Sequence, residues 1–145
     1  MVRKNRTNNN TEKTRSGCEV DQFDNKHYFF EGELHRENGP AVESAIGDKY
    51  WYVHGKYHRT NGPAIELING YKAWYIHGSY HREGGPAIEN TNGDKYWYLN
   101  DQLHRIDGPA EDYASGNKYW WYHGEEIDCS SQEEVERLIK LKALW

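Results

Sequence analysis

Two polar side chains that could bind a ligand, a histidine and the arginine after it, recur at intervals of 23 residues. Four guanidinium groups in register could line a groove and bind carboxylates or phosphates through paired hydrogen bonds. Alternatively, each arginine pairs with an acid of its own unit or caps carbonyls at a turn, and each histidine hydrogen-bonds to the next turn. A feature present in every unit usually serves the unit, which favours this second interpretation. The arginines are Arg36, Arg59, Arg82 and Arg105, and the acids are Glu43, Glu66, Glu89 and Asp112.

The eight histidines raise the possibility of a metal site. Equivalent positions in neighbouring units lie two strands apart, about 9–10 Å at ordinary strand spacing, which is too far for two of them to share a zinc ion. His54 with His58, and His77 with His81, bracket a turn and could meet. The fourth unit, however, carries Asn100 at the first of these positions. We therefore predict no metal and no cofactor.

No group of residues breaks the repeat in the way that an active site would. Chemistry needs one asymmetric arrangement of acid, base and pocket. The irregular positions are Asp101, Glu111, Tyr113 and Trp121, and they form no recognisable triad or dyad. The sequence therefore predicts a protein that is not an enzyme.

The elements that must position these residues are short strands. Gly-Pro-Ala, a later Gly, a Lys and an aromatic residue return every 23 residues, without an insertion. Within one unit, residues 63–67 and 72–76 read as two strands around Asn69-Gly70, a turn in which we expect both central residues to have positive φ. His77-Gly78 is expected to turn the chain again. Stacked hairpins of this kind predict an elongated sheet.

Alternation along the second strand of each hairpin assigns two faces. One column is bulky and apolar, and we assign it to the buried side: Tyr28, Trp51, Trp74, Trp97 and Trp120. The opposite column contains Tyr52, Tyr75, Tyr98 and Trp121. Such amphipathic rings suit a half-wet, adhesive surface, although they could equally be packing surface in a chain with few aliphatic residues.

The two ends of the chain differ from the repeats. Residues 1–17 are polar and basic, and we expect a disordered tail. Residues 18–128 form the array, with units at about 27–49, 50–72, 73–95 and 96–118 and a half unit at 119–128. A capping-box pattern at residues 131–134 predicts a helix within residues 129–145 that covers the last strand. The fold class is therefore all-β: tandem 23-residue hairpins in an elongated curved sheet or solenoid, with a C-terminal α-helical cap.

Charge and cysteine content restrict the partners. Residues 1–17 carry five basic residues and one acidic residue, so the remainder carries 13 basic and 22 acidic residues. A net acidic body argues against duplex nucleic acid as the default partner. Two isolated cysteines form no disulfide framework. We expect no signal peptide or membrane span, and therefore a cytoplasmic protein for which membrane contact is a minor alternative.

The unit resembles MORN repeats in its length and in the segments Gly47-Asp48-Lys49-Tyr50 and Gly93-Asp94-Lys95-Tyr96. It departs from them in its Trp-Tyr pair, its His-Arg pair and Gly-Pro-Ala. It is more similar to the MORN-like variants of short bacterial and viral proteins, including the YwqK-type antitoxin family. The resemblance covers about residues 27–124 and implies a curved sheet of hairpins that contacts protein or lipid, without an active site.

These observations predict a non-enzymatic protein-binding module, acting stoichiometrically as an inhibitor or antitoxin-like protein on a larger partner. The alternative is a binder of an anionic small ligand, a nucleotide or a lipid headgroup, through the arginine column. The identity of the partner and the oligomeric state are left open. The predicted binding residues are Tyr52, Tyr75, Tyr98, Trp121, Arg36, Arg59, Arg82 and Arg105.

Overall fold

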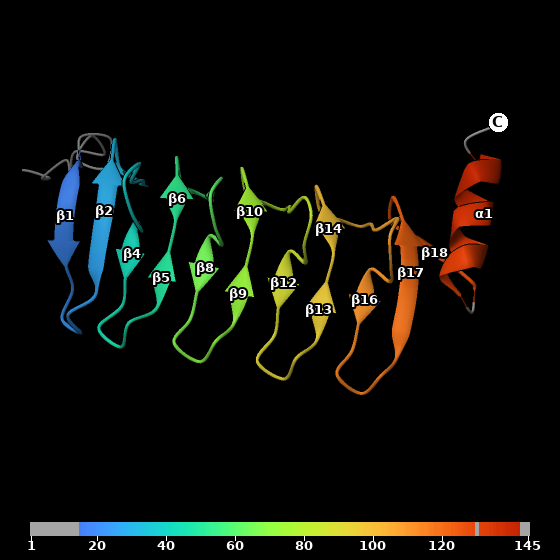
Figure 1. Cartoon of the computed structure of the whole chain (residues 1–145). Helices are drawn as coiled ribbons and strands as arrows, with labels where there is room; N and C mark the ends of the chain where they lie inside the picture. Colours follow the sequence, from blue (N-terminus) through green and yellow to red (C-terminus); the bar gives the residue numbers. More distant parts are fainter. Residues whose placement is uncertain (1–14, 130, 143–145) are drawn as a thin grey trace, which may run out of the picture.

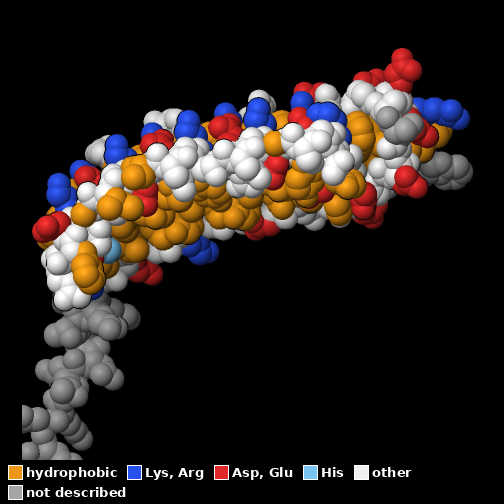
Figure 2. All heavy atoms as spheres, turned by 90° about the horizontal axis from the view of Figure 1, so that it is seen from below, with side chains coloured by type: hydrophobic (Ala, Val, Ile, Leu, Met, Phe, Trp, Pro, Cys, Tyr) orange, Lys and Arg blue, Asp and Glu red, His pale blue; other side chains and the backbone are white. Residues whose placement is uncertain are grey.

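Each 23-residue unit folds into β-hairpins that stack side by side along one axis (Figure 1). The computed structural model describes residues 15–129 and 131–142. The described strands form a long, open antiparallel sheet, and the helix lies at its C-terminal end (Figure 1). The predicted fold class is confirmed, with the sheet open rather than closed into a solenoid. Figure 2 shows the elongated, gently curved shape and a band of hydrophobic side chains along it.

Strands from neighbouring units alternate in the main sheet, in the order β1-β2-β4-β5-β8-β9-β12-β13-β16-β17-β18, with β3 also paired to β2. Three two-stranded sheets, β6–β7, β10–β11 and β14–β15, lie beyond it. The bounds are β1 Gly17–Val20, β2 Lys26–Phe30, β3 Glu33–Leu34, β4 Val42–Glu43, β5 Lys49–Tyr50, β6 Tyr52–Val53, β7 Lys56–Tyr57, β8 Ile65–Glu66, β9 Lys72–Ala73, β10 Tyr75–Ile76, β11 Ser79–Tyr80, β12 Ile88–Glu89, β13 Lys95–Tyr96, β14 Tyr98–Leu99, β15 Gln102–Leu103, β16 Glu111–Asp112, β17 Lys118–Tyr122, β18 Glu125–Ile127 and α1 Gln132–Lys142.

The repeated tryptophan stands between the two halves of its hairpin. Trp51 separates β5 from β6; its N–H donates to the carbonyl of Ala64 at 2.8 Å, and its carbonyl accepts from the N–H of His58 at 3.0 Å. Neighbouring units are also joined in the outer half, because Arg59 N–H donates to the carbonyl of Tyr75 at 3.1 Å. Gly78 N–H likewise donates to the carbonyl of Tyr57 at 2.8 Å, so isolated backbone hydrogen bonds join the outer halves of neighbouring units.

The two turns of a unit have different geometries. In the His-Gly turn, His77 has φ 51° and Gly78 has φ 90°, so both central residues are left-handed, as a type I′ hairpin turn requires. At Asn69-Gly70 only Gly70 has positive φ, at 97°, and Leu67 N–H donates to the carbonyl of Tyr71 across a three-residue loop. The prediction of two positive φ values at Asn69-Gly70 was therefore wrong, since the extra loop residue lets a single glycine reverse the chain.

Little of the sheet is fully buried, because no second layer formed by the described residues covers it. The alanines of Gly-Pro-Ala have 0% exposure, whereas the tryptophans of the repeats are half-buried. The prediction that the tryptophan column lies on a buried side was wrong in this respect: both faces are half-exposed. The inaccessible positions in the sheet are alanines: Ala73 of β9, and the alanines in register with the repeated aromatic residue, Ala41, Ala64, Ala87 and Ala110.

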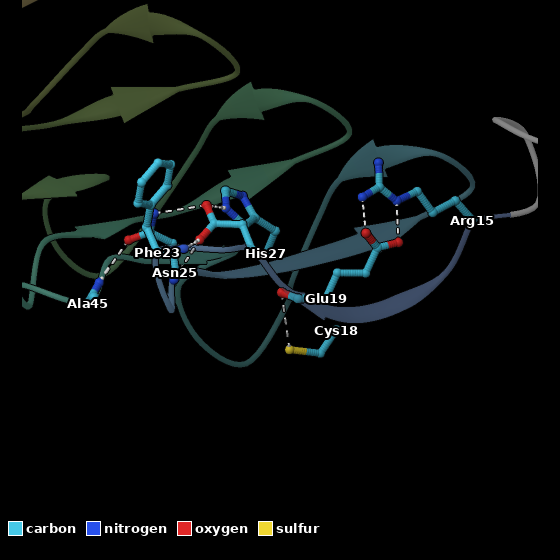
Figure 3. A network of polar contacts seen from close by, with 8 residues as sticks. Arg15, Cys18, Glu19, Phe23, Asn25, His27 and Ala45 are labelled. Carbon is cyan, nitrogen blue, oxygen red and sulfur yellow. Dashed lines mark hydrogen bonds and ion pairs between the residues drawn. The ribbon is translucent and has the colours of Figure 1, made fainter.

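The ends of the array are built differently. At the C-terminal end, Gln132 of α1 accepts a hydrogen bond from Trp120 Nε1 at 3.2 Å and donates to the carbonyl of Ile106 at 2.7 Å. Most of the predicted N-terminal tail, residues 1–14, lies outside the described residues. Its last part belongs to the array, because the carbonyl of Arg15 accepts from Gly32 N–H at 2.8 Å and β1 begins at Gly17. At the same end, Asn25 Oδ1 accepts from the N–H of Ala45 at 2.9 Å and ties two turns together (Figure 3).

The packing of α1 against the array can be tested at Val135, which is fully buried. Val135→Ala should lower the free energy of unfolding by about 2 kcal/mol, from roughly 0.8 kcal/mol per buried methylene plus a cavity contribution. Leu141→Ala is the matched control, because Leu141 is 47% exposed on the same helix. Urea unfolding measures both. Equal effects of the two substitutions would contradict a docked helix.

Candidate binding site

The repeated arginine lies flat on the repeated aromatic ring. The guanidinium carbon of Arg59 is 3.8 Å from the centroid of the Trp51 ring. The same distance is 3.8 Å in the first unit, where the ring is Tyr28, 3.8 Å in the third unit and 4.1 Å in the fourth. The glycine of Gly-Pro-Ala faces the other side of the guanidinium. A Cβ on Gly62 would lie 2.8 Å from Arg59 Cζ, closer than real contacts allow. A larger residue at this position would therefore push the guanidinium away from its place on the ring.

Each arginine is also held by hydrogen bonds within its own unit. Arg59 Nη1 donates to the carbonyl of Pro63 at 2.9 Å and to Glu66 Oε1 at 2.7 Å. The first and third units repeat this arrangement with Glu43 and Glu89. Pairing of the arginine with the acid of its own unit, the interpretation favoured from the sequence, is thus the observed geometry in these three units.

The fourth unit departs from that arrangement. Arg105 Nε donates to Asp107 Oδ1 at 2.8 Å, while Asp112 accepts from Lys118 Nζ at 2.5 Å. The sequence analysis expected Arg105 to pair with Asp112. An aspartate is one methylene shorter than the glutamate of the other units, so its carboxylate is held by the cross-strand lysine in register with it.

The repeated histidine links its unit to the next turn, as predicted. His58 Nδ1 accepts from the N–H of His77 at 3.1 Å, and His104 Nδ1 accepts from the N–H of His123 at 3.1 Å. The ring centroids of these pairs lie 4.4 Å apart. From the sequence, His54 and His58 could meet; in the structure each ring lies against a histidine of a neighbouring unit, His54 against His35 and His58 against His77.

Three equivalent pockets open on the tryptophan-bearing side of the sheet, which we call the Trp face. Each lies between consecutive arginines, with volumes of about 500, 570 and 360 Å³. Each lining includes a tryptophan, an aliphatic residue two positions later, a histidine and two arginines, together with residues of the loops that follow the arginines. The apolar pairs are Trp51 with Val53, Trp74 with Ile76, and Trp97 with Leu99.

The net charge of these pockets is close to zero. Each of the four arginines is paired with a carboxylate of its own unit. Glu83 lines two of the pockets as well. The pockets therefore combine an apolar floor with cations whose charge is compensated locally, a surface better suited to a protein side chain than to a free anion.

The opposite side of the sheet, the Tyr face, carries a ladder of tyrosine rings. The centroid distances alternate between 4.3 Å within a hairpin and 5.1–5.3 Å between hairpins, along the rings of Tyr52, Tyr57, Tyr75, Tyr80 and Tyr98. Burial raises the pKa of Tyr52, Tyr75 and Tyr98 above the ordinary tyrosine value. It also raises the pKa of the neighbouring Tyr71, to about 12. All four hydroxyls are therefore neutral at physiological pH. The predicted binding tyrosines thus pack against Tyr57 and Tyr80, which lie between them, and they remain partly exposed.

Trp121 lies apart from the tyrosine ladder. Its Nε1 donates to Glu111 Oε2 at 3.0 Å, and both residues line a pocket of about 360 Å³ with Tyr113 and Tyr119. The neighbouring Trp120, not Trp121, donates the hydrogen bond to Gln132 of α1. The structure therefore separates the eight predicted binding residues into the arginines on the Trp face, three tyrosines on the Tyr face and Trp121 near the C-terminal end.

Sequence reasoning missed the aliphatic lining of the pockets. Val53, Ile76 and Leu99 follow the tryptophan by two residues in each unit, so the same alternation that grouped the tryptophans placed them on one face. The feature of the sequence that could have indicated a pocket is the loop after each arginine. Residues of this loop lie beside the tryptophan of the next unit and form one wall of the pocket.

No cluster of three or more histidine, cysteine or acidic side chains in residues 15–129 and 131–142 could hold a metal ion. The helix in this part of the chain is too short to cross a membrane.

No protein-family model matches this chain, and no curated protein matches it either. The resemblance to MORN-like repeats therefore stays a prediction from the residues quoted above.

The histidine links predict that acid weakens the array. Burial and the neighbouring histidines lower the pKa of His58 and His104 in the folded chain. Their contribution to stability is therefore complete above the ordinary histidine pKa of about 6.5, and it is lost as the pH falls through that value towards the lower folded pKa. Protonation also removes Nδ1 as the acceptor for the next turn.

The measurement is the melting temperature between about pH 7.5 and about pH 5, over which these histidines titrate. In the double variant His58→Asn, His104→Asn, the amide oxygens can accept the same hydrogen bonds without titrating, so the melting temperature should fall less on acidification than it does in the unaltered chain. An equal fall in both proteins would show that other groups control the acid sensitivity.

Proposed function

We propose that the chain is a non-enzymatic protein-binding module whose Trp face receives side chains of a partner protein in a row of equivalent pockets. The observation that carries this proposal is the recurrence of one pocket, with one lining, between successive units. Tryptophan and arginine, which line every pocket, are also the residue types that most often dominate protein interfaces.

The neutral character of the pockets favours a protein partner over an anionic small ligand. In three units, an anion bound by the arginine column would compete with a glutamate already 2.7–2.9 Å from each guanidinium. A partner's apolar side chain needs no such exchange, because it can pack on the tryptophan and aliphatic surface while the ion pairs remain in place.

The spacing of the pockets suggests the form of the partner segment. Equivalent positions are two strands apart, which corresponds to about 9.6 Å in an antiparallel sheet. Three residues of a polyproline II segment advance about 9.3 Å. An extended segment that lies across the strands could therefore place every third side chain in a successive pocket. The Tyr face, with Tyr52, Tyr75 and Tyr98, is the alternative docking surface.

The experiment first selects binding peptides from a displayed random library on the immobilised chain and then measures their affinities in solution. Ile76→Glu and Leu99→Glu place a charge in two pockets and should each lower affinity at least tenfold, or about 1.4 kcal/mol. Ile68→Glu is the matched control, because Ile68 is 66% exposed and lies in the Asn-Gly loop, away from the pockets. Melting temperatures establish that each variant is folded.

Two outcomes would contradict this proposal. Selected peptides that bind the two pocket variants as well as the control exclude the Trp face. A loss of affinity in Tyr75→Ala, with no loss in the pocket variants, would assign binding to the Tyr face. Peptides that contain an apolar or proline residue at every third position would support the expected spacing.

A further inference from the structure

The two ends of the sheet are protected unequally. At the C-terminal end, α1 packs beside β17 and β18 through the hydrogen bonds of Gln132 and the buried Val135 (Figure 1). At the other end, β1 is the outermost strand among residues 15–129 and 131–142; within them it pairs with β2 alone, and all four of its residues are exposed. A strand at the edge of a sheet presents unpaired N–H and carbonyl groups to any chain that can align with them.

The register of β1 shows which of its groups point outward. Asp21 N–H donates to the carbonyl of Asn25, and the carbonyl of Arg15 accepts from Gly32 N–H, so the odd-numbered residues face β2. The backbone groups of the intervening residues, Ser16, Cys18 and Val20, therefore point away from the sheet. Figure 3 shows Cys18 and Glu19 on this outer strand.

We propose that β1 pairs antiparallel with β1 of a second copy of this chain, with Cys18 opposite Cys18 of the other copy. The two sheets then form one continuous sheet across a two-fold axis. Because the pair is two-fold symmetric, Ser16 of each copy lies opposite Val20 of the other, and Gly17 of each copy lies opposite Glu19 of the other. All three outward-facing residues of each copy are matched with outward-facing residues of the other.

Charge and strand length select this register over its neighbours. A shift of two residues in one direction places Glu19 opposite Glu19. Each carboxylate is paired with Arg15 of its own chain, but the two are still brought directly opposite one another, which is unfavourable. The shift in the other direction places Val20 opposite residue 14, outside the described strand. The register centred on Cys18 avoids both.

A second copy fits this edge better than an unrelated strand because the edge is complementary to itself. The outward groups at 16, 18 and 20 are symmetric about Cys18, so a single contact satisfies both copies. Pairing also ends at two chains, because the opposite end of each sheet is covered by α1. A contact in which both copies use the same surface gives a closed dimer rather than a fibre.

The first test is the molar mass of the full chain in solution by light scattering over a range of concentrations. We expect a concentration-dependent species of twice 17.1 kDa. Val20→Pro removes an outward-facing donor and leaves the hydrogen bonds between β1 and β2 intact, so it should give a folded monomer. Its melting temperature should equal that of the unaltered chain at concentrations where the unaltered chain is monomeric. Val20→Ala loses the same side chain but retains the donor, and it should remain dimeric.

The register is tested by oxidation with diamide in a Cys129→Ser background, so that Cys18 is the remaining thiol. Directly opposed residues of a hydrogen-bonded antiparallel pair have Cα atoms about 5.5 Å apart, within the range that a disulfide spans. We expect rapid formation of a covalent dimer, and slow formation when Val20→Pro is added.

A chain that is monomeric at every concentration overturns the proposal. So does a dimer that persists in Val20→Pro, or one in which Cys18 does not crosslink. A monomer that becomes a dimer only after deletion of residues 1–14 also overturns it for the full chain, because that segment would then occupy the edge of its own sheet.

Discussion

The contact on which the rest of the structure depends is the stacking of an arginine on the aromatic ring of its unit. A single-layer sheet has no opposing layer to cover its apolar rings, and here the guanidinium serves as that cover. Its planar shape lets it lie 3.8 Å from a tryptophan ring, and its edge can donate to a proline carbonyl and a glutamate at once. A lysine offers the same charge without the plane.

Several features of the repeat follow from this contact. The glycine is needed because the guanidinium occupies the space of its Cβ, the proline supplies an acceptor carbonyl, and the alanine is small because it lies in register with the tryptophan. The arginines and the loops that follow them also form the walls between the pockets. The proposed binding surface is thus a consequence of the way each unit stabilises itself.

The sequence was sufficient to predict the repeat, the hairpins, the elongated array and the terminal helix, since these depend on local periodicity and turn residues. It was insufficient where a choice depends on geometry between units. The stacking of His58 on His77 rather than on His54, and the pairing of Asp112 with Lys118 rather than Arg105, follow from register and side-chain length. The half-exposed tryptophans were missed because composition indicates how many rings a chain has, but not what covers them.

The most direct test of this account is a double-mutant cycle between Arg59→Ala and Gly62→Ala, with the free energy of unfolding measured in urea. If Gly62 is required only because Arg59 occupies its Cβ position, Gly62→Ala should destabilise the unaltered chain and have almost no effect once Arg59 is alanine. The coupling should be about 1–3 kcal/mol, the range for groups in direct contact. An equal cost of Gly62→Ala in both backgrounds would show that the glycine serves the backbone alone, and that the stacked arginine does not organise the repeat.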